Sequence, residues 1–126
     1  MSTLKVTNIQ DTSGGNSSTS EEIYNGRAKV WVNFNGTGTV AIRASFNVNT
    51  ITDNSTGNYT VNFSNSMSDA NYCAMVSPGN NAGGGQGSWC TIYDDVTTLS
   101  GSCRVATYSN SGTFQDTEQM FFAVFR

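Results

Sequence analysis

The chain has 126 residues and a formal net charge of −3, and charged residues make up only 12% of it, against about 25% in an ordinary soluble protein. Its two lysines and four arginines are spread along the sequence. A nucleic-acid partner requires clustered cations that displace counterions from phosphates, so the composition argues against nucleic-acid binding. The length and the 11% of aromatic residues predict one folded domain with a neutral, polar surface.

The first ten residues, MSTLKVTNIQ, lack the apolar core and the small-residue cleavage site of a signal peptide. No apolar run in the chain approaches the ~20 residues that cross a bilayer. We therefore expect no membrane insertion and assembly in the cytoplasm. Residues 4–9 predict a short strand, whose apolar residues are Leu4, Val6 and Ile9.

Residues 11–20, DTSGGNSSTS, are glycines and small polar residues and predict a flexible linker. Thr19 and Glu22 have the spacing of a capping box, which predicts a single helical turn over residues 20–25. Gly26 is suited to end that turn. The segment before the first long strand is thus expected to be flexible except for this turn.

The clearest pattern is RAKVWVNFNGTGTVAIR, which alternates apolar and polar residues on both sides of an Asn-Gly pair. Asn35-Gly36 readily adopts the positive φ angles of a tight hairpin turn. The first strand is expected to present one apolar face made of Ala28, Val30, Val32 and Phe34. The returning strand, predicted over residues 40–48, is expected to present Val40, Ile42, Ala44, Phe46 and Val48 on one face.

The rest of the chain repeats this pattern at intervals of about ten residues. A turn is predicted over ITDNSTGN, residues 51–58. Further strands are predicted over residues 59–63, 71–76, 89–93, 103–108 and 118–125. The fold class is therefore all-β, an antiparallel β-sandwich or small barrel of about seven to eight strands. Residues 1–26 are predicted to be an N-terminal attachment strand and linker, and residues 27–126 the β-sandwich domain.

No group of residues has the composition of a catalytic or metal site. The chain has no histidine, which removes the commonest general base and the Ser-His and Cys-His nucleophile pairs. Gly83–Gly87 is glycine-rich, but no Gly-Lys-Ser/Thr follows it. Asp94 and Asp95 would project to opposite faces of a strand, unlike the paired carboxylates of a glycosidase. We expect no enzyme activity, no cofactor and no metal.

The three cysteines are Cys73, Cys90 and Cys103. Their odd number fits reduced thiols better than a disulfide framework, and no CxxC spacing suggests a metal site. Cys90 and Cys103 bracket a predicted hairpin, so a disulfide between them in an oxidising medium stays open as an alternative.

Residues 26–63, GRAKVWVNFNGTGTVAIRASFNVNTITDNSTGNYTVNF, resemble a repeated module of bacteriophage virion proteins that is found in tail fibres and other appendages. The shared features are RAxxWVNFNGTGT, SFNV and ITDNxTGxYTVNF. The leader LKVTNIQDTSGG, MSDANYCAMV at residues 67–76 and the closing FFAVFR extend the resemblance less sharply. Residues 77–117 match no part of it, so specific ligands or partners are expected to bind there.

The resemblance implies a virion structural protein, a homotrimeric tail-fibre or tail-appendage component that attaches to the host surface. A capsid decoration or head-fibre protein is the alternative, and a polysaccharide-degrading enzyme is a remote third. The expected partners are other virion proteins, sister subunits and a host surface glycan or receptor. The strand at residues 4–9 is expected to dock on another virion protein through Leu4, Val6 and Ile9, with pairing inside its own domain as the alternative.

Receptor contacts are expected in two loops, residues 77–88 and 109–117, because binding residues commonly lie on loops of a rigid scaffold. The expected contact residues are Asn80, Asn81, Gln86, Trp89, Tyr108 and Asn110. For Trp89 and Tyr108 the alternative is packing in the core.

Subunit contacts are expected on a second apolar face. It comprises Trp31, Phe121 and Phe125, and it is covered either by a second sheet or by neighbouring subunits.

Overall fold

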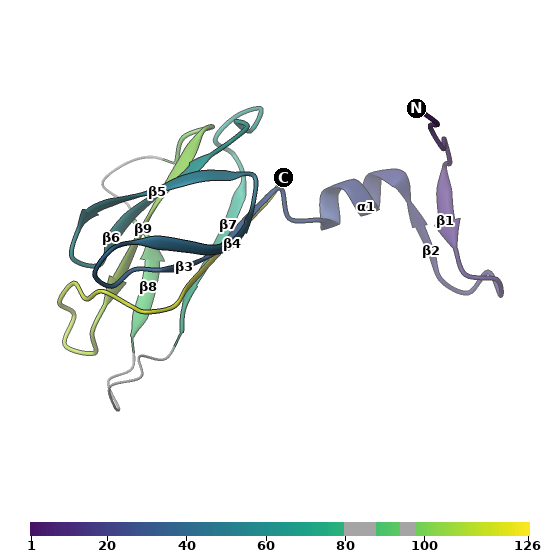
Figure 1. The fold of residues 1–126 in the computed structure, drawn as a ribbon. Coiled ribbons are helices and arrows are strands. Elements are labelled where there is room, and N and C mark those ends of the chain that lie inside the picture. Colours follow the sequence, from purple (N-terminus) through teal and green to yellow (C-terminus); the bar gives the residue numbers. More distant parts are fainter. Residues whose placement is uncertain (80–87, 94–97) are drawn as a thin grey trace.

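The computed structural model describes residues 1–79, 88–93 and 98–126. The predictions for Asn80, Asn81, Gln86, the Gly83–Gly87 run and the Asp94–Asp95 pair lie outside these residues. In the described part, two four-stranded sheets form the body of the molecule, and a hairpin and a helix precede it (Figure 1).

The body is an antiparallel β-sandwich, which confirms the predicted fold class. Sheet I has the order β4 (Ala41–Phe46), β3 (Val30–Asn35), β10 (Met120–Phe125), β7 (Cys73–Pro78). Sheet II has the order β5 (Val48–Ser55), β6 (Asn58–Phe63), β9 (Ser102–Tyr108), β8 (Trp89–Ile92). These eight strands agree with the predicted number for the sandwich, and the described residues contain two more strands near the N-terminus.

The core lies between the sheets and is built from alternate residues of the central strands. Successive side chains of a strand point to opposite faces, so every second residue of β3 and β10 is buried. The main buried side chains are Val30, Val32, Phe34, Tyr59, Val61, Phe63, Cys103, Val105, Met120, Phe122 and Val124. Phe34 of sheet I meets Tyr59 of sheet II edge to face, with ring centroids 5.4 Å apart, and this contact joins the two sheets.

The loop between β3 and β4 is longer than the predicted two-residue turn. Its positive φ, 60°, occurs at Gly38 and not at Asn35 or Gly36. Gly36 is needed for another reason, because a Cβ there would lie 2.6 Å from the Tyr59 hydroxyl oxygen. That oxygen lies 2.7 Å from the Gly36 carbonyl, so the loop is anchored to the opposite sheet.

A β-bulge changes which residues of β4 face inward. Phe34 pairs with Ile42, but the register shifts by one residue on the way to Trp31, which pairs with Phe46. Phe46 therefore lies on the outer face of sheet I beside the exposed Trp31. The prediction that Ile42, Ala44 and Phe46 lie on one face of the strand is wrong for this reason.

Asn47 forms a corner at which the chain passes from sheet I to sheet II. Its φ of 57° is in the left-handed region, which asparagine tolerates better than most residues. The side chain is fixed because its Nδ2 donates to the Lys29 carbonyl at 3.2 Å and its Oδ1 accepts from the Asn65 amide at 2.8 Å. The strand predicted over residues 40–48 is thus divided between two sheets, and most of ITDNSTGN belongs to β5 instead of a turn.

Residues 1–26 form an arm that projects from the body (Figure 1). In it, β1 (Asn8–Gln10) pairs with β2 (Ser17–Thr19), and α1 (Ser20–Gly26) follows. The predicted capping box is confirmed: Thr19 Oγ1 accepts from the Glu22 amide at 3.0 Å, and Glu22 Oε2 accepts from the Thr19 amide at 2.7 Å. The helix has seven residues and is longer than the single predicted turn.

The turn between β1 and β2 corrects the prediction of a flexible linker at residues 11–20. Asp11 closes it, because Oδ1 accepts from Ser13 Oγ at 2.8 Å and Oδ2 accepts from Asn16 Nδ2 at 2.9 Å. These hydrogen bonds, that of Ser13 above all, lower the pKa of the Asp11 carboxyl to about 2. Local side-chain hydrogen bonds therefore order a segment whose composition suggested flexibility.

The strand predicted over residues 4–9 begins only at Asn8. Leu4 and Val6 precede it, and Ile9 lies within it. All three side chains are exposed, Leu4 most of all at 84%. The pairing of β1 within the arm leaves these apolar residues without a covering surface.

The three cysteines are free thiols. Cys90 lies opposite Thr107 in the β8–β9 pairing, four residues further along β9 than Cys103. That separation is about 13 Å along the strand, beyond the reach of a disulfide, so the alternative of a Cys90–Cys103 bridge is wrong. Among the described residues, no helix is both long and apolar enough to cross a membrane.

Candidate functional site

Four aromatic side chains form a continuous stack at the β8 edge of sheet II. We call Trp89, Tyr108, Phe114 and Tyr93 the aromatic stack. The ring centroids of Trp89 and Tyr108 are 4.2 Å apart at an interplanar angle of 14°. Phe114 lies 4.7 Å from Tyr108 and 6.0 Å from Tyr93. Trp89 is the outermost ring and is 47% exposed, so an aromatic surface is open to solvent.

Backbone pairing explains why these rings meet. Tyr108 alternates with the buried residues of β9 and points outward, together with Trp89, its partner in the β8–β9 register. After β9 the chain turns back, and the Ser109 amide donates to the Thr113 carbonyl at 2.8 Å. The turn brings Phe114 into an isolated β-bridge with Tyr108. The Trp89 indole N–H donates to the Ser109 carbonyl at 3.1 Å and fixes the outermost ring.

Arg104 closes the other end of the aromatic stack. Its guanidinium carbon lies 4.7 Å from the Tyr93 ring centroid, and its Nε donates to Asn58 Oδ1 at 2.6 Å. Asn58 belongs to a ladder of amides and hydroxyls on the outer face of sheet II. The other members of the ladder are Thr50, Thr52, Asn54, Thr60 and Asn62. Sheet II therefore has a polar outer face with an aromatic edge.

The outer face of sheet I is apolar instead. We call Trp31, Phe46, Met75 and Phe121 the apolar face, and each of these side chains is between 40% and 60% exposed. Trp31 and Met75 flank Ala123 of β10 in register. Met75 and Phe121 also line a hollow of about 360 Å³. A patch of this kind on a soluble protein commonly marks an interaction surface.

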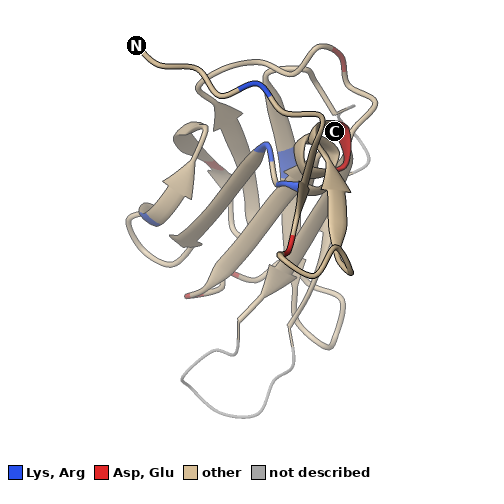
Figure 2. Cartoon of the chain, turned by 90° about the vertical axis from the view of Figure 1, so that its right-hand side faces the viewer, with Lys and Arg blue, Asp and Glu red and all other residues tan. Residues whose placement is uncertain are grey.

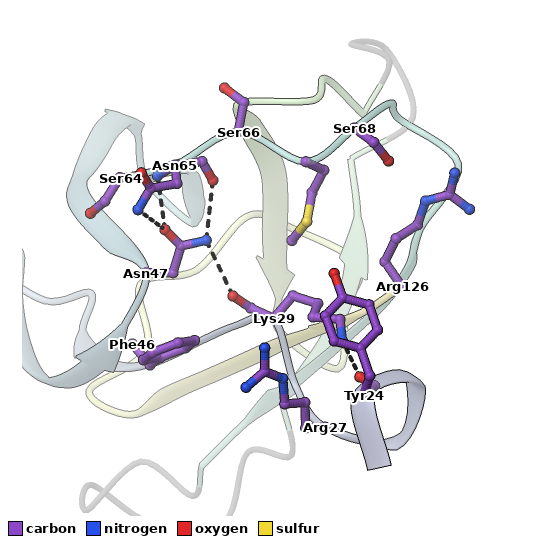
Figure 3. Close-up of a pocket in the computed structure, with 11 residues that line it drawn as sticks. Tyr24, Arg27, Lys29, Phe46, Asn47, Ser64, Asn65, Ser66, Ser68 and Arg126 are labelled. Carbon is purple, nitrogen blue, oxygen red and sulfur yellow. Dashed lines mark hydrogen bonds between the residues drawn. The ribbon is translucent and has the colours of Figure 1, made fainter. Parts of the chain in front are cut away.

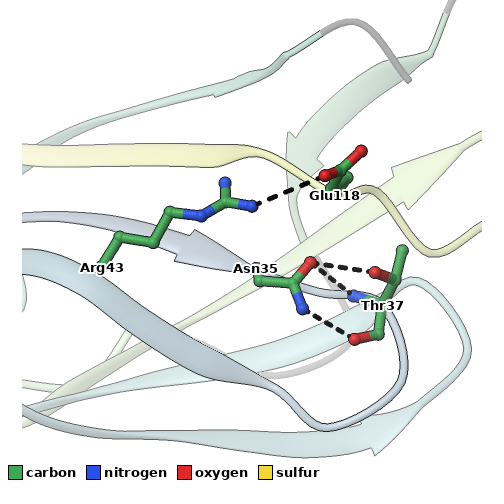
Figure 4. A network of polar contacts seen from close by, with 4 residues as sticks. All are labelled: Asn35, Thr37, Arg43 and Glu118. Carbon is green, nitrogen blue, oxygen red and sulfur yellow. Dashed lines mark hydrogen bonds and ion pairs between the residues drawn. The ribbon is translucent and has the colours of Figure 1, made fainter. Parts of the chain in front are cut away.

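Polar side chains of β4, the β3–β4 loop and the segment before β10, which we call the polar rim of sheet I, are drawn in Figure 4. Arg43 Nη2 lies 4.0 Å from Glu118 Oε1, and both side chains are substantially exposed. Asn35 Nδ2 donates to the Thr37 carbonyl at 2.8 Å, and Asn35 Oδ1 accepts from Thr37 Oγ1 at 2.9 Å. An exposed ion pair contributes little to stability.

The aromatic stack and its polar neighbours suit the binding of a saccharide. Aromatic faces carry negative partial charge that attracts the C–H groups on the apolar face of a sugar ring, and amides and hydroxyls can pair with sugar hydroxyls. Among the described residues, no group of three His, Cys, Asp or Glu side chains could hold a metal ion. Burial raises the pKa of the Cys103 thiol to about 11 and also raises that of Cys90, which makes both poor nucleophiles.

Two of the six expected contact residues, Trp89 and Tyr108, lie side by side. Neither is in the core: Trp89 is half-exposed, and Tyr108 is partly buried inside the stack. Asn110 is exposed in the turn that follows β9. The other three expected contacts lie outside the described residues, and receptor contact stays a prediction for all six.

Sequence reasoning missed Phe114, Tyr93 and Arg104. Phe114 lies in SGTFQ, which has no strand pattern, and only its bridge to Tyr108 places it in the stack. Tyr93 joins the stack only because Phe114 does. The one usable signal was the alternation of CRVATY, which puts Arg104 and Tyr108 on the same face.

No family model, no curated protein and no solved structure matches this chain. The fold and the site define a β-sandwich with an N-terminal arm, an aromatic stack on one sheet and an apolar face on the other. The likeness of residues 26–63 to a phage virion module therefore stays a resemblance.

Proposed function

We propose that the chain is a structural protein of a bacteriophage virion, a tail-fibre or tail-appendage component that attaches to a glycan on the host surface. The observation that carries this proposal is the aromatic stack with its exposed outermost ring, Trp89. The strand β8 and the turn after β9 lie on the side of the body away from the arm (Figure 1), which suits a contact surface at the free end of an attached subunit. The resemblance of residues 26–63 supports the virion context. Such a role requires binding, and we propose no catalytic activity.

The arm is proposed to attach the body to another virion protein. Leu4, Val6 and Ile9 are exposed, and a two-stranded hairpin is at best marginally stable alone. Docking of these side chains on a partner would remove apolar surface from water and stabilise the arm. Ile9→Asp is therefore expected to reduce incorporation into particles, whereas Ser17→Asp, on the opposite face of the hairpin from Ile9, serves as the control.

The apolar face is proposed to pack against other copies of the chain. Four large side chains that are about half exposed present on the order of 400 Å², about half of the roughly 800 Å² per partner of a standard interface. No described charged side chain belongs to the apolar face, so copies meet there without like-charge repulsion. The expectation of three copies comes from the resemblance.

A capsid decoration or head-fibre protein is the second candidate, because an arm with exposed apolar residues suits attachment to a shell as well as to a tail. Electron microscopy of particles labelled with a gold-tagged antibody against this chain separates the two. Label on the tail or its fibres supports host attachment, and label over the head supports decoration. Particles without label would contradict both.

Binding of the purified protein to the bacteria that the particles infect tests the attachment role. Trp89→Ala is expected to lose most of the binding, because it removes the exposed ring of the stack. Trp31→Ala is the matched control, since it removes a similarly exposed tryptophan from the other sheet. Equal binding by the Trp89 variant and the unchanged protein would contradict the proposed contact.

A further inference from the structure

A cavity lies where the arm meets the body (Figure 3), and we call it the junction pocket. Its volume is about 500 Å³, within the ~300–1,000 Å³ of small-molecule sites. Tyr24 and Arg27 line it from the arm side, Phe46 from the end of β4 and Ser66 from the segment after β6. It shares no residue with the aromatic stack, and of the apolar face it shares only Phe46, on the edge strand β4. It is therefore a separate candidate site.

Positive charge is concentrated in the junction pocket. Arg27, Lys29 and Arg126 line it, three of the six cationic residues of the sequence, and no described lining residue is acidic. Seen from the arm side, charged residues are sparse; blue segments lie near the middle of the view, and a red segment lies beside the C-terminus (Figure 2). Arg126 pairs with Asp69, whereas Arg27 and Lys29 have no carboxylate partner in the described part of the chain. The pocket thus holds two uncompensated positive charges in an acidic protein.

Tyr24 holds these two cations in place. Lys29 Nζ donates a hydrogen bond to the Tyr24 carbonyl and lies 3.3 Å from the centroid of the Tyr24 ring. The Arg27 guanidinium carbon lies 5.2 Å from the same centroid. Loss of hydration, followed by repulsion from Arg27, lowers the pKa of Lys29. An anion between the two cations would relieve that repulsion.

Neutral hydrogen-bonding groups and one ring complete the pocket. Its hydroxyls, which make no hydrogen bond within the described residues, belong to Ser64, Ser66 and Ser68. The Asn65 side chain donates to Asn47 Oδ1 at 3.1 Å, so the two amides are fixed in position. Phe46 is 52% exposed and offers an apolar surface at the wall. The pocket therefore combines cations, hydroxyls and a ring face.

We propose that the junction pocket binds an anionic sugar unit, with the carboxylate or phosphate on Arg27 and Lys29 and the sugar ring against Phe46. Two fixed cations suit one anionic group, to which they donate charge-assisted hydrogen bonds. A nucleic acid would need a longer row of cations. This charge-selective site does not depend on the virion role or on the aromatic stack.

Calorimetric titration of the full chain with methyl glucuronide, glucose 6-phosphate and neutral methyl glucoside tests the proposal. At least one anionic probe is expected to bind about tenfold or more tightly than methyl glucoside, and the stronger of the two identifies the preferred anion. Binding of that probe is expected to weaken as salt rises from about 20 to about 300 mM, because the cations are exposed. Equal affinities for all three sugars, or no binding of either anionic probe, would overturn the proposal.

Variants locate the site. Arg27→Gln is expected to weaken binding of the anionic probe about tenfold or more, whereas Arg43→Gln, at the polar rim of sheet I, leaves it unchanged. Lys29→Gln provides a second variant if Arg27→Gln alters the circular dichroism spectrum. Trp89→Ala is expected to retain binding of the probe, which separates this site from the aromatic stack. Unchanged affinity in both Arg27→Gln and Lys29→Gln would place the anion elsewhere and contradict the assignment.

Discussion

The two outer faces of the sandwich share a scaffold but differ in chemistry. Sheet I presents Trp31, Phe46, Met75 and Phe121, whereas sheet II presents a ladder of threonines and asparagines that ends at an aromatic edge. The inward positions of both sheets hold the same kinds of residue, mainly valines and aromatic side chains. The inward positions thus specify the sandwich, and the outward positions specify what each sheet can contact.

The two tryptophans illustrate this difference. Trp31 and Trp89 are similarly exposed, at 40% and 47%. Trp31 is paired with Ala123 and Phe46 on an apolar surface, while Trp89 stacks on Tyr108 and donates a hydrogen bond from its indole N–H. We therefore expect the first to contact protein and the second to contact saccharide.

Gly57→Ala should destabilise the whole sandwich, and with it both outer faces. It is expected to have the largest effect of the substitutions proposed here. Gly57 has a φ of 64°, and a Cβ there would lie 2.5 Å from the Thr107 carbonyl oxygen and 2.6 Å from the Gln115 nitrogen. Backbone atoms cannot move aside, so the free energy of unfolding is expected to fall by about 3 kcal/mol or more in urea titrations. Gly38→Ala is the control, because its φ is also positive but nothing lies within 4 Å, and about 1 kcal/mol is expected. Equal losses in the two variants would contradict this reading of Gly57.

Phe121→Glu should weaken self-association through the apolar face of sheet I without changing the outer face of sheet II. A carboxylate on the apolar face would be buried without a partner in the assembly, so the association constant is expected to fall about thirtyfold or more. Sedimentation velocity measures the effect. Thr60→Glu places the same charge on the ladder of sheet II and should leave association unchanged. Association that resists Phe121→Glu would show that copies meet through another surface.

Phe114→Ala should weaken saccharide binding without changing self-association. The Phe114 ring supports Tyr108 at 4.7 Å, and its loss is expected to cost about 1 kcal/mol, or roughly fivefold in affinity for host polysaccharide. Phe121→Ala is the matched control, because Phe121 is a similarly exposed phenylalanine on the other sheet. If Phe121→Ala weakens saccharide binding as much as Phe114→Ala does, saccharide binding is not confined to the aromatic stack, and the assignment is contradicted.

Acidification should weaken the β1–β2 hairpin of the arm while leaving both outer faces intact. This is the smallest of the expected effects. The pKa of Asp11 is lowered by its hydrogen bonds to about 2, so their stabilisation is present above the ordinary value of 3.8 and is lost as the pH falls toward 2. Nuclear magnetic resonance contacts between β1 and β2 are expected to weaken over that range. Asp11→Asn should remove most of this pH dependence. A hairpin that keeps its contacts at pH 2 would contradict the role of the carboxylate.

The sandwich could be predicted where residues alternate regularly. Val30, Val32 and Phe34 of β3, and Met120 and Phe122 of β10, are buried as their period-two pattern indicated. The capping box was also predictable, because it depends on residues three positions apart. Local patterns thus specified these elements.

Features that depend on distant residues could not be predicted. Asn47 divides a continuous alternating run because its side chain bonds to Asn65 and to the backbone of Lys29. Phe46 faces outward because of a bulge in the β3–β4 pairing. In the candidate site, Phe114 meets Tyr108 only after the chain turns back beyond β9. None of these contacts produces a repeating pattern of apolar and polar residues in the sequence.

The central claim is that the two outer faces have different partners, and the two tryptophans of the chain provide one probe for each face. Trp31→Phe leaves only Trp89, and Trp89→Phe leaves only Trp31. Fluorescence emission of each variant is measured during dilution and during titration with host surface polysaccharide. In Trp89→Phe, we predict that the emission of Trp31 shifts to longer wavelength on dilution and does not change when the polysaccharide is added. In Trp31→Phe, we predict that the emission of Trp89 changes when the polysaccharide is added and does not change on dilution. If both tryptophans respond to the same treatment, or if the responses are exchanged, the division of function between the faces is contradicted.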